Sequence, residues 1–407
     1  MSKFACLGGS PLRSRPFPPW PIVDHADESA LLNVLRSGKW GRHQGNMTET
    51  FEQRFASYQG ARFGVGVVNG SVAIRLALHA AGIQPGDEVI FPAYTFFSTA
   101  SSVVEVNAIP VFVDISPDTY CLDPDAIEAA ITSRTRAVMP VHFAGQAAAM
   151  HEIMDIASRY GLIVIEDASH AHGAEYQGRR LGSIGEMSTF SFQASKNLTC
   201  GEGGIILTSD EGYERMCRSL HTCGRFPDSA WYEHHVLGGN YRMNELQAAL
   251  LCSQMDRLEE QVRLREANGS FLNNELSKIP GIRPMQRGFG ESRHGYHLYI
   301  FRYDSTAFHG LPREIFLKAL NAEGIPCSSG YDRPLYKQPV FLERAFGPYL
   351  SEAVTYQNYA QISLPVSEQA CQEACWLAQS LLLGNQNDMV DIVEGVNKVY
   401  QYHQELL

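Results

Sequence analysis

The sequence predicts an α/β protein whose large domain holds a mainly parallel sheet between helices. Between about residues 60 and 210, short apolar runs alternate with amphipathic stretches, the pattern of repeated strand–helix units. A long helical stretch then leads into a second region of mixed pattern, and 407 residues are enough for two domains. We expect an N-terminal arm over residues 1–30, a large domain over 31–265 and a smaller α+β C-terminal domain over 266–407.

The individual elements follow from the periodicity of the apolar residues. The arm is rich in Pro and Gly and is expected to be extended, and helices are expected over 26–37 and 47–58. Phe51 and Phe55 lie four residues apart and therefore share one face of the second helix. Strands are expected at 63–68, 88–91, 110–114, 137–141, 162–166, 187–192, 204–208 and 296–302. Further helices are expected at 72–81, 97–105, 124–131, 148–160, 244–276, 312–323 and 389–405.

The composition argues against several classes of function. The formal net charge is −11, and an acidic chain is poorly suited to bind the phosphate backbone of nucleic acids. No apolar run is long enough to span a membrane, and the N-terminal residues lack the apolar core of a signal peptide. The nine cysteines are scattered and never spaced C-x-x-C, which indicates reduced thiols. We therefore expect a cytoplasmic protein without membrane or nucleic-acid partners.

The first candidate site is the turn Asn69-Gly70-Ser71 between an expected strand and an expected helix. Glycine lets a ligand approach the backbone, a serine hydroxyl can donate, and the start of a helix presents free N–H groups. Together these features suit a phosphate. The same residues also suit a plain strand-to-helix turn in which Ser71 caps the helix. Because such turns are common, the motif alone leaves both interpretations open.

The second candidate is Asp167, which ends the buried strand that contains Glu166. Ligands of α/β sheets bind beyond the carboxyl ends of the strands. There Asp167 can keep a pyridine nitrogen protonated, because an adjacent anion raises the pKa of a cation, or it can simply cap a helix. His170 and His172 follow, but no further cluster of Cys and His completes a metal site, so no metal is expected.

The third candidate is Lys196, which follows an apolar strand and precedes the cluster Gly201-Glu202-Gly203-Gly204. Burial lowers the pKa of a lysine and makes its amine a nucleophile toward carbonyl groups. The alternative is a solvated lysine on a surface loop, which is the common fate of this residue type.

The order of these three candidates is more informative than any one of them. A phosphate turn, an aromatic residue, an aspartate at a strand end and then a lysine match the requirements of pyridoxal phosphate (PLP), which needs a phosphate cup, a ring partner, an acid at the pyridine nitrogen and a Schiff-base lysine. At this point the chain resembles the sugar aminotransferases of the DegT/StrS family, which are PLP enzymes of fold type I. The resemblance extends over most of the chain and rests on Gly38-Lys39-Trp40, the 191–204 block, Gly239-Asn240-Tyr241-Arg242-Met243-Asn244-Glu245, Gly324-Ile325-Pro326 and Ser363-Leu364-Pro365.

The resemblance assigns roles to individual residues. It makes Lys196 the lysine that carries the cofactor and Asp167 the partner of the pyridine nitrogen. It places His170, where the family usually has Gln, near the ring hydroxyl, and Phe96 against the ring face. It implies a homodimer with shared active sites. The phosphate cup that it implies consists of Gly70, Ser71, Val72 and Ser191, together with Asn240 of a neighbouring subunit.

The resemblance also limits the substrates. It is greatest for the branch that acts on keto-cyclitols and for the amino-hydroxybenzoate synthases, whose amino donors are glutamine or glutamate. His142, Tyr331 and Arg333 are candidate substrate contacts; the alternatives are a hydrogen-bonded histidine, a turn tyrosine and a surface arginine. The cues for this branch are Pro18-Pro19-Trp20-Pro21, Thr119-Tyr120-Cys121-Leu122-Asp123-Pro124 and Leu364-Pro365-Val366-Ser367-Glu368.

Other functions stay open at this point. A sugar dehydratase of the same group is one alternative, although relatives that deoxygenate sugars replace the lysine with His, and Lys196 is present here. A non-catalytic sensor that binds the cofactor or a sugar is another. A nicotinamide oxidoreductase would require G-x-G-x-x-G after the first strand, and that motif is absent there. Whether the acceptor is a free cyclitol or a nucleotide sugar is not decided by the sequence.

Overall fold

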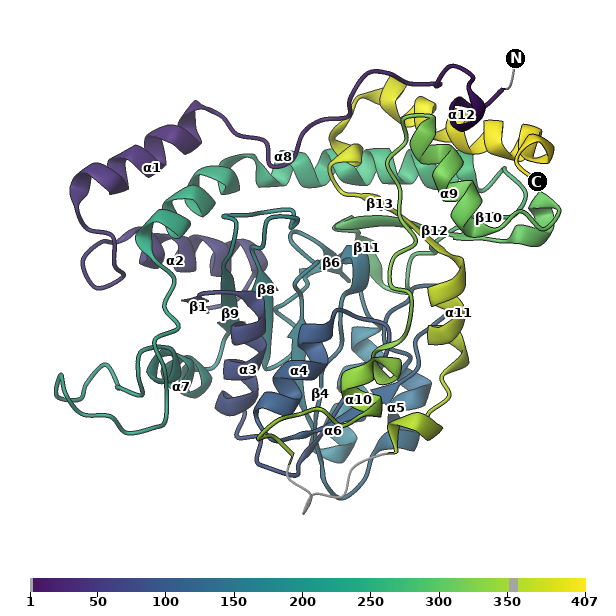
Figure 1. Ribbon diagram of the computed structural model, residues 1–407. Helices are drawn as coiled ribbons and strands as arrows, with labels where there is room; N and C mark the ends of the chain where they lie inside the picture. The colour runs from purple at the N-terminus through teal and green to yellow at the C-terminus, as the bar shows by residue number, and fades with distance from the viewer. Residues whose placement is uncertain (1–2, 351–357) are drawn as a thin grey trace.

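A seven-stranded sheet forms the centre of the computed structural model, which describes residues 3–350 and 358–407 (Figure 1). The strand order is β1-β9-β8-β5-β4-β2-β3. Among these strands, β9 alone runs antiparallel to its neighbours, so the prediction of a mainly parallel sheet is confirmed. The strands are β1 (Phe63–Val67), β2 (Glu88–Pro92), β3 (Ile109–Val113), β4 (Thr135–Val138), β5 (Ile163–Asp167), β8 (Met187–Ser191) and β9 (Gly204–Thr208).

Helices cover both faces of this sheet, and two apolar cores result. In β2, Val89 and Phe91 belong to one core and Ile90 to the other, because successive side chains of a strand point to opposite faces. The helices of one face are α3 (Gly70–Ala80), α4 (Phe97–Glu105), α7 (Glu211–His221) and α10 (Pro339–Leu342). Those of the other face are α2 (Met47–Gln59), α5 (Pro124–Ala130), α6 (Met150–Tyr160) and the first half of α8 (Glu245–Leu276).

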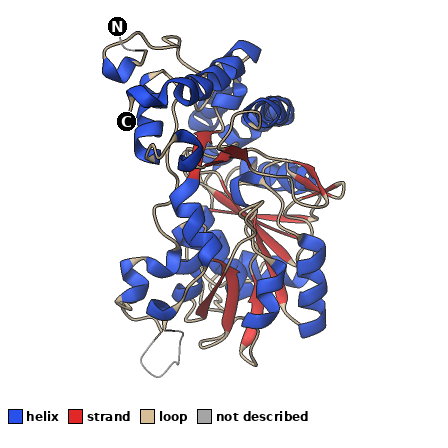
Figure 2. Ribbon diagram, turned by 90° about the vertical axis from the view of Figure 1, so that its right-hand side faces the viewer, coloured by secondary structure: helices blue, strands red, loops and turns tan. Residues whose placement is uncertain are grey.

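A smaller α+β unit lies at the far end of α8 and has its own core, as Figures 1 and 2 show. Its antiparallel sheet has the order β10-β12-β13. The predicted domain boundary at residue 265 falls inside α8, which runs unbroken between the two units, and the division at that residue stays a prediction. The elements of this unit are β10 (Ile282–Pro284), β12 (Leu298–Tyr303), β13 (Ala374–Ala378), α9 (Arg313–Ala322) and α12 (Gln386–Tyr402).

The N-terminal arm connects the smaller unit to the main sheet. Arg13 forms ion pairs with Asp388 and Asp391 of α12, at 2.7 and 2.5 Å. Further along, Trp20 Nε1 donates to the carbonyl of Ala194, at 2.9 Å. The arm ends where α1 (His25–Ser37) begins with a capping box. It therefore lies against two distant segments of the chain.

Several short elements were not expected from the sequence. They are β6 (Glu175–Tyr176), β7 (Arg179–Arg180) and β11 (Glu291–Arg293), which form a second small sheet, and also β13, α7 and α11 (Pro365–Glu373). Strands of two or three residues are too short to show periodicity. The expected strand 296–302 begins instead at Leu298, because Tyr296 has a positive φ of 45°. In the described residues no helix is long and apolar enough to cross a membrane.

Candidate active site

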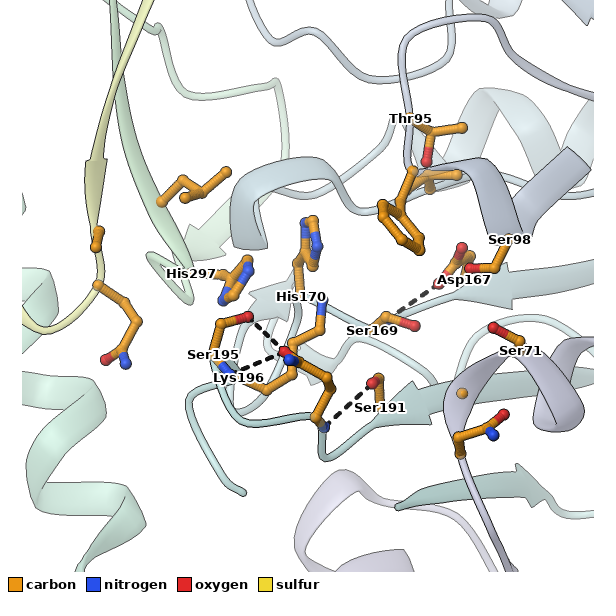
Figure 3. A pocket seen from close by; sticks show the side chains of 18 of the residues that line it. Ser71, Thr95, Ser98, Asp167, Ser169, His170, Ser191, Ser195, Lys196 and His297 are labelled. Atoms are coloured by element: carbon orange, nitrogen blue, oxygen red, sulfur yellow. Dashed lines mark hydrogen bonds between the residues drawn. The ribbon is translucent and has the colours of Figure 1, made fainter. Parts of the chain in front are cut away.

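The carboxyl ends of β1, β2, β5 and β8 meet at a cavity of about 770 Å³, whose wall is completed by residues of the smaller unit. Figure 3 shows Lys196 and His297 on one side of this cavity, and Asp167 and Ser71 on the other. This is where a doubly wound sheet binds its ligand. The site residues on the wall that the sequence predicted are Gly70, Ser71, Phe96, Asp167, His170, Ser191, Lys196 and Tyr331.

The turn after β1 has the geometry of an anion site. Asn69 caps α3, since its side-chain oxygen accepts from the N–H of Val72 at 2.9 Å. The exposed Ser71 and the N-terminus of α3 face the cavity. Gly70 lies so close to β8 that a Cβ added to it would be 2.8 Å from Cβ of Ser191. Close packing of helix on strand thus brings free N–H groups and two hydroxyls to one place, as a phosphate requires.

Asp167 ends β5 and is almost fully buried, at 5% exposure. One of its oxygens accepts from the hydroxyl of Thr99 at 2.9 Å, and the other accepts from the N–H of Ser169 at 3.2 Å. These bonds fix the carboxylate at the cavity wall. A buried, oriented anion is the chemistry that a pyridinium nitrogen needs.

Lys196 lies on the cavity wall in a short loop after β8. Burial lowers its pKa to about 8, although the negative charge of Asp167 acts in the opposite direction. Its backbone N–H donates to the carbonyl of Gln193 at 2.9 Å, and the Gln193 side chain accepts from both the N–H and the hydroxyl of Ser195. Hydrogen bonds within the loop therefore fix its conformation. With this lowered pKa, part of the Lys196 amine is neutral near neutral pH.

The imidazoles of His170 and His297 are in contact, with ring centroids 4.1 Å apart and planes tilted by 34°. Nδ1 of His170 accepts from the N–H of Ala144 at 3.2 Å, so the hydrogen of the neutral ring is on Nε2. Nδ1 of His297 contacts the side-chain oxygen of Asn197, whose amide nitrogen donates to Gly295, so this ring carries its hydrogen on Nδ1. Burial is the main reason why the pKa values of both histidines lie well below 6.5. The charge of Lys196 lowers the pKa of His170 further, and the neighbouring His170 lowers that of His297.

Aromatic side chains form much of the remaining wall. Phe96, at the start of α4, is 57% exposed and borders the cavity. Tyr331 and Trp376 lie edge to face with centroids 4.9 Å apart, and Tyr331 also contacts Tyr94. An exposed ring on a cavity wall can cover a flat ligand, which is the position expected for Phe96.

Three predicted contacts do not lie on the wall. His142 is a correction: it is fully buried behind the wall, its Nε2 bonds Glu166 at 2.9 Å, and its Nδ1 accepts from Ala148. Neither ring nitrogen is left to contact a substrate. Arg333 is exposed, pairs with Asp332 at 2.8 Å and lies outside this cavity. The N–H of Val72 is already used by the helix cap, so Gly70 and Ser71 are left as the cup on this turn.

The loop between α7 and α8 projects from the body of the protein (Figure 1). Asn240 lies near its end, where the chain has returned to the sheet and the carbonyl of Tyr241 accepts from the N–H of Val68 at 2.9 Å. It is exposed, its backbone pairs with Thr222, and it does not line the cavity of its own chain. Its role at the site of a second subunit stays a prediction. The same loop carries Trp231, Tyr232 and Leu237, which are 79, 78 and 98% exposed.

Some residues of the site were missed by sequence reasoning. Thr99, which orients Asp167, is an unremarkable residue of an expected helix. Thr95 and Glu202 also belong to the large domain, whereas the remaining missed residues come from the arm or the smaller unit, where no local motif marks them as neighbours of the lysine. Of these, Trp20 stood in a motif used only to identify the branch. The missed lining residues include Trp20, Thr95, Glu202, His297, Trp376, Gln379 and Ser380.

The described residues fit pyridoxal phosphate on the grounds of their own chemistry. Only glycine at position 70 lets the start of α3 pack this closely on Ser191, since a Cβ there would lie 2.8 Å from Cβ of Ser191, and this packing places the helix N-terminus and the Ser191 hydroxyl where a phosphate would bind. Asp167 and Lys196 face one cavity as an acid and a desolvated amine. The described residues contain no cluster of three metal-binding side chains.

Comparison with known proteins agrees with this chemistry. The chain is 39% identical to a putative L-glutamine:3-amino-2,3-dideoxy-scyllo-inosose aminotransferase of Streptoalloteichus tenebrarius, and the match covers 98% of both chains. It is 38% identical to the L-glutamine:2-deoxy-scyllo-inosose aminotransferase of the same organism, over 99% of this chain and 98% of that one. A crystal structure of 3-amino-5-hydroxybenzoic acid synthase superposes with a TM-score of 0.87 at 33% identity, covering 97% of this chain and all of that one.

The family model of the DegT/DnrJ/EryC1/StrS aminotransferases matches residues 21–395. The fold is that of the fold-type-I PLP aminotransferases, as predicted. This chain is therefore a pyridoxal-phosphate-dependent transaminase and belongs to the DegT/DnrJ/EryC1/StrS aminotransferase family.

Proposed function

We propose that this protein transfers the amino group of L-glutamine to the keto group of a cyclitol in the biosynthesis of an aminocyclitol. The observation that supports this most directly is the cavity in which Lys196, with its lowered pKa, and Asp167 lie together. The choice of donor and acceptor is supported by the printed names of the relatives, which are glutamine:scyllo-inosose aminotransferases. Within one chain, Lys196 is the single Lys or Arg of the described lining, which suits a neutral acceptor better than a nucleotide sugar.

The residues divide the work as follows. Gly70, Ser71 and Ser191 hold the cofactor phosphate, Phe96 covers the ring, and Asp167 keeps a proton on the ring nitrogen. Pyridoxal phosphate supplies an electron-withdrawing ring, which makes the hydrogen on the α-carbon of an amino acid acidic.

Lys196 and His170 complete the catalytic group. Lys196 would hold the cofactor through Nζ, and as a free amine Nζ would accept the proton of the donor α-carbon. Lys196 later delivers a proton to the carbon that is aminated. His170 donates through Nε2 toward the ring hydroxyl, because its Nδ1 is occupied by Ala144.

The protein is proposed to act as a homodimer. The exposed Asn240 reaches the phosphate of the neighbouring subunit, and the apolar side chains of the same loop pack there. A cytoplasmic location is also proposed, and it is supported by nine free cysteines.

An absorption spectrum of the purified holoenzyme tests the function. We expect a visible band from the lysine-bound cofactor, which L-glutamine converts to the near-ultraviolet band of pyridoxamine phosphate. A cyclitol ketone should then restore the visible band. A visible band that neither glutamine nor glutamate changes would favour the dehydratase, and a protein that binds no cofactor would favour the sensor.

A further inference from the structure

Arg265, near the middle of α8, is a fully buried arginine that forms no ion pair within the described residues. Its Nε and Nη2 both donate to the side-chain oxygen of Gln379, at 2.9 and 2.5 Å, and its Nη1 is buried without a hydrogen-bond partner. Burial lowers the pKa of this guanidinium to about 9, so it is still charged at neutral pH. A buried charge without a counter-ion is costly. The protein therefore retains an uncompensated positive charge beside its active site.

Gln379 lies between Arg265 and the cavity. It follows β13 directly and lines the same cavity as Lys196. Because two nitrogens of the Arg265 guanidinium donate to Oε1, the orientation of the amide is fixed, and Nε2 points away from them. Among the described residues Nε2 has no hydrogen-bond partner. Its two N–H donors are thus available to a ligand, with the positive charge of Arg265 behind them.

Trp20 completes this arrangement from the N-terminal arm. Its indole lies 5.4 Å from the guanidinium carbon of Arg265, and its Nε1 donates to Ala194 in the loop of Lys196. It also lines the cavity. The arm thus shields the Arg265–Gln379 pair on one side and is tied to the loop of the lysine.

The cavity needs such a group for one of the two substrates. An amino acid brings an α-carboxylate, whereas a cyclitol brings only neutral hydroxyl groups. In the described lining Lys196 is the sole Lys or Arg, and it is occupied by the cofactor; Asp167 and Glu202 add negative charge. A positive potential in a partly desolvated site favours an anion over a hydroxyl group.

We propose that Gln379, oriented and polarised by Arg265, binds the α-carboxylate of the amino donor. This inference rests on the proposed function, since it assumes an amino acid as donor. Gln379 contacts the substrate directly, and Arg265 is a positioning residue that acts through it. Discrimination between donor and acceptor then resides in the smaller unit and the arm, while the chemistry resides at the ends of the large sheet.

The variant Gln379→Glu tests the proposal, because it keeps the shape and the contact with Arg265 but replaces the N–H donors with a negative oxygen. The binding probes are glutaramate, which is glutamine without its amino group, and the uncharged pentanediamide. Calorimetry on the holoenzyme should show glutaramate binding weakened at least about tenfold, the cost of one charge-assisted hydrogen bond. Pentanediamide binding should change less than about twofold. The melting temperature should not fall, because Arg265 gains a charge partner.

Gln193→Glu is the matched control, since it adds the same charge to the same cavity at a side chain that bonds Ser195 and not Arg265. It should weaken glutaramate binding less than about twofold. In stopped-flow spectra of Gln379→Glu, the concentration of glutamine needed for half-maximal conversion should rise, while the ketone half-reaction stays as in the wild type.

Three outcomes would overturn the proposal: unchanged glutaramate binding in Gln379→Glu, equal weakening of both probes, or equal weakening by both glutamate variants. The proposed function fails differently. In that case the visible band of the wild-type enzyme does not respond to glutamine, whereas the calorimetric comparison does not depend on turnover.

Discussion

At the scale of a single residue, two opposing effects set the pKa of Lys196. Burial lowers its pKa to about 8, while the carboxylate of Asp167 limits that decrease. A lysine in water has a pKa near 10.4 and is almost entirely protonated at neutral pH. The cavity therefore increases the fraction of neutral amine, which is the form that attacks a carbonyl group.

The capture of pyridoxal phosphate by the apoenzyme should follow this pKa. Protonation blocks the amine, so the rate of capture should rise with pH and level off above about pH 8. Stopped-flow measurement of the visible band between pH 6 and 10.5 checks this. A rate that keeps rising to the upper end of that range would indicate an ordinary lysine.

Asp167 is the second residue whose role can be isolated. Asp167→Asn keeps the shape but removes the charge that holds a proton on the ring nitrogen, so turnover should fall by about 10²–10⁴-fold. Thr99→Val removes one hydrogen bond to the carboxylate and should cost about tenfold. Steady-state kinetics compare the two, and a smaller loss in Asp167→Asn than in Thr99→Val would contradict the assignment.

At the scale of secondary-structure elements, the contact between α3 and β8 determines where the proposed phosphate cup lies. The cup exists because the N-terminus of α3 packs directly on the end of β8, and Gly70 permits that approach. Gly204 of β9 is equally close, because a Cβ there would lie 2.4 Å from the carbonyl carbon of Asn69. Two glycines thus set the position of the helix terminus over the sheet.

Gly70→Ala should displace this terminus and weaken the binding of pyridoxal phosphate at least about tenfold, since the free N–H groups lose their alignment with the phosphate. Fluorescence titration of the apoenzyme measures the dissociation constant. Ser71→Ala removes a hydroxyl group without a clash and should have a smaller effect. Wild-type affinity in Gly70→Ala would show that the phosphate binds elsewhere.

At the scale of the whole molecule, the cavity of a single chain lacks one of the proposed site residues, Asn240. Asn240 is exposed and does not line its own cavity, and the loop that carries it also exposes Trp231 and Leu237. An isologous dimer would cover this loop and bring each Asn240 to the partner site. The enzyme should therefore be at least dimeric.

Mixing an inactive variant with an impaired one tests the shared sites. Lys196→Ala removes the amine that holds the cofactor, and Asn240→Ala removes the proposed contact with the phosphate of the neighbouring subunit. Each homodimer therefore has two defective sites. After dissociation and random reassociation, half of the dimers are hybrids with one intact site, and about a quarter of wild-type activity should return. Activity and light scattering are measured on the mixture, and a fully active monomer or the absence of complementation would contradict shared sites.

Local patterns predicted the residues of the large domain to which we assign the chemistry. Ser71, Asp167 and Lys196 each follow a strand of the central sheet, and the carboxyl ends of such strands converge by geometry alone. His142 shows the limit of this reasoning. It also follows a strand, but Glu166 and the Ala148 N–H occupy its ring nitrogens, which only three-dimensional packing reveals.

The sequence by itself determined the α/β class and the main strands, because these depend on periodicity, and its motifs predicted a set of cofactor residues. Only the tertiary structure decided what faces the lysine from outside the large sheet. Trp20, Arg265, His297 and Gln379 come from four separate segments and meet there through long-range packing. Contacts between distant segments depend on how the units pack together, and no local periodicity encodes that arrangement.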